Sequence, residues 1–175
     1  MTPIAPDSRA RPSRRLVLAL PLALLLAAGL TAPPAHADLS KKVIAAFKGK
    51  ILVTKDPLEM VGDDKATVAH FKKTALTELK GAAGGDEVWT WQFVYTAFLA
   101  KGAGTTSLKL EFYDGKTYSA DRVLTGVDPK STVLAGDIEI TEDDGLTKGK
   151  SYTLKLVASV KGKDVTLATT QLRMH

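Results

Sequence analysis

Apolar and polar residues alternate at every second position along several short stretches of the chain. In residues 107–113, Leu108, Leu110 and Phe112 fall on one side of an extended segment, and charged residues fall on the other. A period of two predicts a β-strand with one buried face, because successive side chains of a strand point to opposite sides. The same alternation predicts strands in the segments 47–53, 137–141, 152–157, 165–167 and 171–174.

Turn residues separate these stretches. Asp114-Gly115 is typical of a two-residue hairpin turn that needs positive φ, and Gly162 lies in a second tight connection. The segments 126–130 and 143–145 indicate longer turns. Short strands punctuated in this way predict an all-β fold, an antiparallel sandwich of two sheets with about seven strands.

The segment 63–81 has a different period. Four apolar residues between Val68 and Leu79 follow helical spacing, aspartates precede them and a glycine follows. Its second half, 74–80, equally suits a strand with alternate residues on one face. We predict a strand over 74–80, preceded by one short helix near 65–72, and the sequence alone leaves both helix and strand open across the segment.

Five aromatic residues gather in the segment 87–99. In an extended strand, Trp89, Trp91, Phe93 and Tyr95 share one face, with neighbours roughly 7 Å apart. The row of rings either fills the core of the sandwich or forms an exposed platform that stacks sugar rings or flat ligands. The opposite face is largely Thr, Gln and Val, which favours the core. The platform interpretation applies mainly to Trp89 and Trp91, at the start of the strand.

A corner-like motif begins at Leu146 and continues with Gly149, Tyr152 and alternating apolar residues. This pattern resembles the corner before the sixth strand of fibronectin type III and related immunoglobulin-like sandwiches. The resemblance implies an Ig-like β-sandwich in which the Tyr152 hydroxyl bonds back to the main chain and the ring lies in the core. The chain departs from the type III pattern, since no proline precedes Gly149 and the second-strand region has no early tryptophan.

Residues 1–37 have the layout of a cleavable export signal. Four arginines precede an apolar run over 16–30, and Ala35 and Ala37 form a small-x-small cleavage site. The run is short for a membrane-spanning helix, which needs roughly 20 residues. A paired arginine also resembles a twin-arginine signal, so the general secretory and twin-arginine routes both stay open.

We therefore predict a signal peptide over 1–37 and a single β-sandwich domain over 38–175, without stable membrane insertion after cleavage. The domain would be periplasmic or secreted. The sequence contains no cysteine, which excludes a lipoprotein anchor, disulfides and a thiol nucleophile. Loss of four arginines and one aspartate with the signal lowers the formal net charge from +5 to +2. Because no basic run tracks phosphates, we expect no nucleic-acid partner.

Residues suited to catalysis are scarce. The domain has two histidines, which assemble no Ser-His-Asp arrangement, so we assign no catalytic residue. Glu142, Asp143 and Asp144 follow one another in a turn, where such acids are commonly solvated. In the alternative they bind calcium with oxygens from a neighbouring loop, although their spacing differs from an EF-hand. We expect no other cofactor.

Plentiful strands and few catalytic residues predict a non-enzymatic interaction or structural module of the bacterial cell envelope. Its protein partner would contact the loops 81–87, 101–106 and 126–136, because loops at the ends of a sandwich carry binding. The alternative function is a carbohydrate or small apolar ligand binder that uses Trp89 and Trp91. A hydrolase is a weaker third hypothesis, since it needs a pocket with a perturbed acid.

Overall fold

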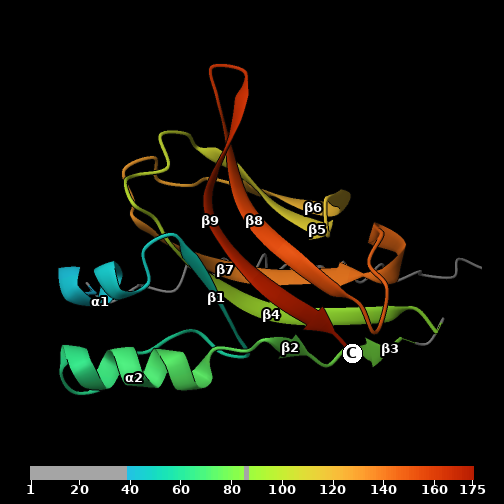
Figure 1. Cartoon of the computed structure of the whole chain (residues 1–175), viewed down its shortest axis with the longest axis horizontal. Helices are drawn as coiled ribbons and strands as arrows, with labels where there is room; N and C mark the ends of the chain where they lie inside the picture. Colours follow the sequence, from blue (N-terminus) through green and yellow to red (C-terminus); the bar gives the residue numbers. More distant parts are fainter. Residues whose placement is uncertain (1–38, 85–86) are drawn as a thin grey trace, which may run out of the picture. The chain divides into compact units, whose positions relative to one another are not determined.

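The computed structural model describes residues 39–84 and 87–175, so the predicted signal peptide lies outside the described residues. The described part is mostly β, as the alternating pattern predicts, with helices near its start (Figure 1). The elements are α1 (Lys41–Ala46), β1 (Lys50–Thr54), α2 (Asp64–Thr74), β2 (Glu78–Leu79), β3 (Ala82–Ala83), β4 (Trp89–Phe98), β5 (Ser107–Asp114), β6 (Thr117–Thr125), β7 (Val133–Thr141), the 3-10 turn η1 (Glu142–Asp144), β8 (Ser151–Val160) and β9 (Lys163–Met174).

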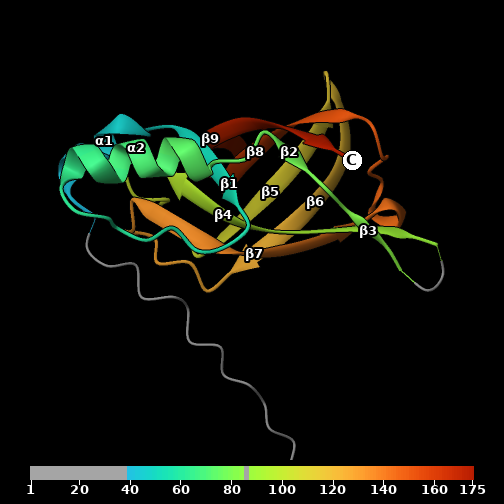
Figure 2. The same cartoon turned by 90° about the horizontal axis from the view of Figure 1, so that it is seen from below.

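The described strands form one curved, mixed sheet of nine strands rather than the predicted antiparallel sandwich of two sheets (Figures 1 and 2). The order is β3-β4-β1-β9-β8-β5-β6, with β7 on the other edge of β4 and β2 beside β9. Both β1 and β2 run parallel to β9. Parallel strands need a long crossover between them, and local alternation carries no information about which distant strand lies alongside.

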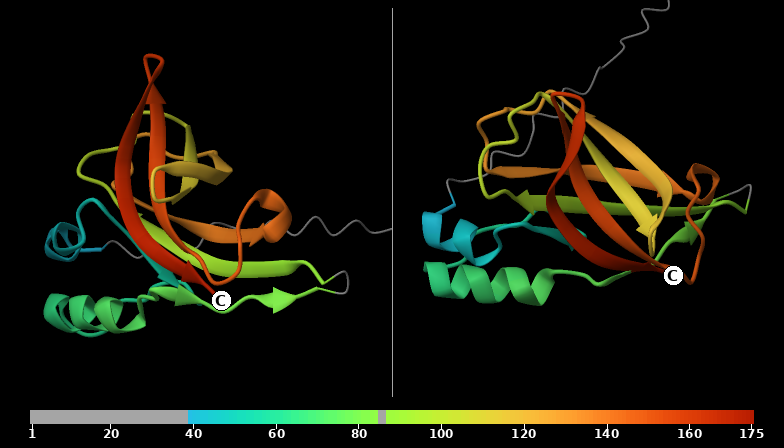
Figure 3. Two further views of the ribbon diagram at one scale, coloured as in Figure 1. Left: turned by 45° about the vertical axis from the view of Figure 1, so that its right-hand side comes forward. Right: turned by 45° about the horizontal axis from the view of Figure 1, so that its top comes forward.

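The hairpins follow the turn signals closely. Gly115 (φ 62°) turns the chain between β5 and β6, and Lys161 (φ 53°) with Gly162 (φ 74°) turns it between β8 and β9. The β8–β9 hairpin is long and extends away from the rest of the sheet (Figure 3). The two strands predicted at 165–167 and 171–174 are both parts of β9.

The larger hydrophobic core covers the inner face of the sheet. The aromatic row of β4 contributes Trp91, Phe93 and Tyr95 to it, so these rings lie inside the fold. Leucines from β5, β8 and β9 pack against them: Leu108, Leu110, Leu154, Leu156 and Leu172. Complete burial of each large apolar side chain stabilises the fold by about 1.5–3 kcal/mol.

A smaller core lies between the helices and the outer face of β1 and β4. Phe47, next to α1, and Phe71 of α2 pack against Phe98 of β4, with ring centroids 5.2–6.4 Å apart. The two helices lie side by side over this end of the sheet (Figure 2). The Ser40 side chain accepts a hydrogen bond from the Val43 amide and so caps the first turn of α1. The alternating pattern did not predict this helix.

The ambiguous segment 63–81 is helical over most of its length. The Asp63 carboxylate accepts a hydrogen bond from Ala66 N, which caps α2, and Phe71 is fully buried. The helix is therefore longer than the predicted 65–72, and the predicted strand over 74–80 is reduced to β2. Burial of Phe71 against the smaller core favours the helical period over the alternating one.

Candidate functional site: a polar groove across β4 and β7

The two tryptophans singled out by the sequence have different environments. Trp91 is fully buried, and its indole N–H donates to the His175 carbonyl at 3.1 Å. Trp89 is partly exposed, and the Lys148 ammonium lies 3.2 Å from the centroid of its ring. A cation over the ring covers the face that a sugar would stack on. The structure therefore brings no pair of exposed indole rings together.

The acidic run belongs to η1 and carries structural bonds. Asp144 accepts hydrogen bonds from Thr141 N (2.8 Å) and Thr141 Oγ1 (3.0 Å), and it forms an ion pair with Arg122 of β6. The Arg122 hydrogen bond lowers the pKa of the Asp144 carboxyl below its usual range, and the bonds from Thr141 act in the same direction. The Glu142 carboxylate accepts a hydrogen bond from Lys148 N at 3.3 Å. Asp143 is exposed.

Arg122 also donates from Nε to the Glu139 carbonyl at 3.1 Å, so one side chain links β6 to β7. These two strands are not paired with each other in the sheet. Within residues 39–84 and 87–175, no group of three or more His, Cys, Asp or Glu residues is arranged to hold a metal ion.

The corner residues stabilise the entry into β8. Leu146 and Tyr152 are buried, and the Tyr152 hydroxyl accepts a hydrogen bond from Thr147 N at 2.8 Å. Gly149 adopts φ 86°, a conformation that glycine tolerates best, and its N–H donates to Met174 O at 2.7 Å. The three residues thus anchor a turn, here within a single mixed sheet.

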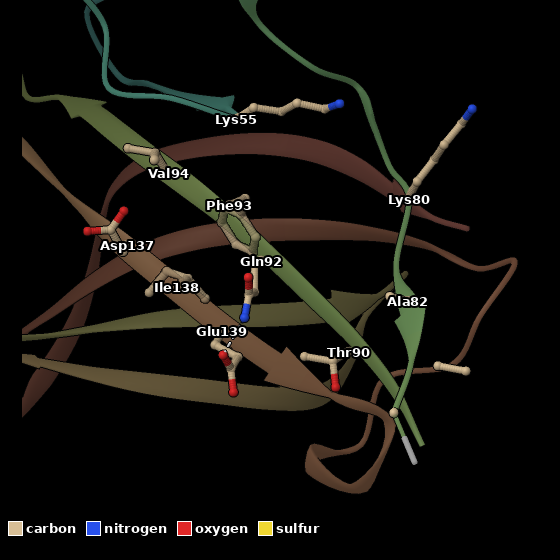
Figure 4. A pocket seen from close by; sticks show the side chains of 12 residues that line it. Lys55, Lys80, Ala82, Thr90, Gln92, Phe93, Val94, Asp137, Ile138 and Glu139 are labelled. Atoms are coloured by element: carbon tan, nitrogen blue, oxygen red, sulfur yellow. Dashed lines mark hydrogen bonds between the residues drawn. The ribbon is translucent and has the colours of Figure 1, made fainter. Parts of the chain in front are cut away.

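A groove of about 700 Å³ crosses the outer face of β4 and β7 (Figure 4). Thr90, Gln92 and Val94, alternate residues of β4, line it together with residues of the neighbouring segments. These three residues lie on the face opposite the aromatic row, and Phe93 of that row also lines the groove. The volume lies within the roughly 300–1,000 Å³ that is common for small-molecule sites.

The groove is located where the strand beside β4 is interrupted. β1 pairs with β4 as far as Val94, and β3 resumes the pairing only at Thr90. Between these points the chain leaves the sheet, passes through α2 and returns. Gln92 therefore has no strand partner on that edge of β4.

Main-chain bonds at the two ends of β4 show which way the polar groups of Gln92 point. Leu99 N donates to Thr132 O on the β7 side, and Gly84 N donates to Val88 O on the β3 side. Successive residues of a strand direct their main-chain groups to opposite edges. Even-numbered residues of β4 therefore face β1 and β3, so the N–H and C=O of Gln92 point into the interruption.

Charged side chains of opposite sign border the groove. Lys55 follows β1 and Lys80 precedes β3, so both flank the interruption, whereas Asp137 and Glu139 lie on β7 across β4 (Figure 4). All four are exposed. The Glu139 carboxylate accepts a hydrogen bond from Gln92 Nε2 at 2.6 Å. Among the described residues, Lys55, Lys80 and Asp137 form no ion pair.

Asp137 also acts on the core beneath it. Burial raises the pKa of the Tyr95 phenol to about 12, and the nearby Asp137 carboxylate contributes to the same shift. Tyr95 therefore stays neutral well above the ordinary tyrosine pKa of about 10. The groove thus lies over an apolar layer that contains the neutral phenol of Tyr95.

A second groove of about 550 Å³ lies between α2 and the segment that follows β1. Lys55 lines both grooves, and His70 and Lys73 of α2 line only the second. Asp56 and Glu59 also line the second groove, so charged side chains of both signs extend from the interruption in the sheet toward the helices.

The sequence predicted the polar face of β4 but not the groove. Lys55 and Lys80 are 25 positions apart, and each is at least 57 positions from Asp137 and Glu139, so the four residues belong to no motif. The one available signal was the alternation of Asp137 and Glu139 with apolar residues in a strand, which places both acids on one face. The lysines could be associated with them only through the sheet order.

The sequence matches no model of a known protein family, and it matches no curated protein. No helix within the described residues has the length and apolar character that crossing a membrane requires.

Proposed function

We propose that the protein is a non-enzymatic binding module of the bacterial cell envelope and that its ligand occupies the groove across β4 and β7. The observation that supports this most directly is the combination of an unpaired strand edge at Gln92 with unpaired charges on both sides of it. The unpaired N–H and C=O groups of a strand edge are a template on which another chain can pair. The proposed location in the envelope rests on the signal-like residues 1–37.

The residues that line the groove favour binding over catalysis. They are lysines, carboxylates, threonine, glutamine and small or apolar residues, without a hydroxyl or imidazole arranged as a nucleophile and its base. A ligand would be held by charge and by main-chain hydrogen bonds. We expect it to be released chemically unchanged.

The tryptophan-based alternative has less support, because only Trp89 reaches the surface and Lys148 covers its ring. The relation to immunoglobulin-like domains likewise remains a proposal. Its support is local, from the Tyr152 hydroxyl bond.

Amide chemical-shift mapping tests the proposed function. The protein expressed from the full chain would be titrated with a panel of short peptides, oligosaccharides and soluble lipid headgroups. We expect one class to shift the amides of Gln92, Lys80 and Asp137, and mass analysis to show the ligand unaltered. Shifts confined to the surroundings of Trp89, or no shifts with any class, would contradict the proposal.

Export is tested separately. We expect the full chain, expressed in a bacterium with an outer membrane, to be recovered from the periplasm or medium with Asp38 as its first residue. Recovery of the uncleaved chain from the cytoplasm would exclude a role in the envelope and leave the binding role to be judged by the titration.

A further inference from the structure

The charges around the groove indicate a ligand with two ionised ends, and we propose that it is a short zwitterionic peptide. Its carboxylate would lie between Lys55 and Lys80, and its amino group would lie at Asp137 and Glu139. This inference rests on the proposed function and specifies the ligand class for the same groove.

The carboxylate end is defined by three donors. Lys55 and Lys80 flank the interruption, and neither ammonium forms an ion pair among the described residues. The main-chain N–H of Gln92 points into the same space. Two cations and an amide N–H suit a carboxylate, because hydrogen bonds to ionised groups are shorter and stronger than neutral ones.

The ammonium end is defined by β7. Asp137 and Glu139 are separated by one residue, so they share the outer face of the strand, roughly 7 Å apart. Glu139 already accepts a bond from the Gln92 side chain, which holds its carboxylate over β4. Asp137 forms no ion pair in the described part of the chain, so it is available to a ligand cation.

The separation of the two ends sets the length of the ligand. The lysines lie on the line of β1 and β3, and Asp137 lies on β7, with β4 between them. Two strand spacings amount to roughly 10 Å. An extended peptide spans at most about 3.3–3.6 Å per residue, so about three residues bridge the gap. A free amino acid is too short to reach both ends.

The middle of the groove suits a peptide more than a sugar. Gln92 presents a main-chain N–H and a C=O on the unpaired edge of β4, and these groups can bond the peptide group of a ligand where it crosses that edge. A neutral oligosaccharide would leave the lysines without a counter-charge. An inorganic anion would use the lysines alone and be repelled by Asp137.

Calorimetric titration with tri-alanine tests the proposal, using the protein expressed from the full chain. We expect tri-alanine to bind. We expect its C-terminal amide, its N-acetyl derivative and free alanine each to bind at least tenfold more weakly. Added salt should weaken tri-alanine binding, because ion pairs at exposed sites are screened.

Charge variants assign the two ends. In the Lys55→Gln/Lys80→Gln variant, tri-alanine and its amide should bind equally. In the Asp137→Asn/Glu139→Gln variant, tri-alanine and its acetylated form should bind equally. Lys116→Gln/Lys163→Gln removes two exposed lysines elsewhere and should leave all affinities unchanged. Circular dichroism checks that each variant is folded.

Several results would overturn the inference. Equal binding of free and capped peptides by the unmodified protein would show that the charged ends are not recognised. Competition by inorganic phosphate as effective as that by tri-alanine would reduce the site to an anion site. If tri-alanine does not bind while another class shifts the groove amides, the inference fails and the proposed function stands. If no ligand class shifts the groove amides, the inference and the proposed function both fail.

Discussion

The hydroxyl of Tyr152 provides a sharp test of how this fold is stabilised. Tyr152→Phe removes the oxygen that accepts the Thr147 N–H at 2.8 Å and leaves a ring that is 2% exposed in place. An ordinary intramolecular hydrogen bond contributes about 0.5–1.5 kcal/mol, and a stranded buried donor costs about 1–3 kcal/mol. Because Thr147 itself is exposed, water can reach its amide. We therefore expect a loss of about 1 kcal/mol in the free energy of unfolding.

Urea unfolding followed by far-UV circular dichroism measures this loss. With a urea slope of about 1–3 kcal/mol per M, the midpoint should fall by roughly 0.5 M with the slope unchanged. Tyr118→Phe is the matched control, since Tyr118 is 51% exposed. The free energy of unfolding of the Tyr118→Phe variant should fall by no more than about 0.5 kcal/mol. Equal losses in the two variants, or none for Tyr152→Phe, would show that the corner bond does not stabilise the domain.

Three further predictions concern other parts of the molecule. Because the pKa of Tyr95 is about 12 in the fold, its protonation should stabilise the native state fully below pH 10. That contribution, up to about 2.7 kcal/mol, should be lost as pH rises from 10 to 12. Tyr95→Phe should remove this part of the alkaline loss in pH-dependent unfolding. In Trp89→Phe, the remaining indole of Trp91 is fully buried, so acrylamide should quench its emission only weakly; strong quenching would contradict that burial. The pKa of Asp144 is lowered by Arg122, so this pair stabilises the fold above the ordinary carboxyl pKa near 4 and loses that contribution as pH falls. Arg122→Gln should lower the free energy of unfolding by up to about 1 kcal/mol at pH 7. In this variant, stability should fall less steeply as the pH is lowered through the acid range. An unchanged fall in stability at acid pH would refute the role of the Arg122–Asp144 pair.

Local pattern predicted the strands well where one face of a strand meets the core. Leu108, Leu110 and Phe112 alternate with polar residues, and all three are buried in β5. The pattern was silent for β6, in which Ala120 is the one buried residue. A strand that buries so little apolar surface has no strong period to detect.

The helical layer shows the limit of periodicity in short segments. α1 is six residues long, too short for a convincing 3.6-residue repeat, and the Ser40 side chain caps its start. In α2 both periods were compatible with the sequence. Contact between Phe71 and the rings of Phe47 and Phe98 favours the helix, and that contact joins residues distant in the chain.

The amino-acid sequence by itself determined that the domain is mostly β and that tight turns fall at Gly115 and Gly162, and it favoured an inward-facing aromatic row in β4. These properties depend on the side-chain period and on the conformational freedom of single residues. Only the tertiary structure decided the parallel pairing of β1 and β2 with β9 and the interruption opposite Gln92. Both depend on which distant segments lie side by side, and the groove with its opposed charges exists only because the chain leaves the sheet after β1 and returns at β3.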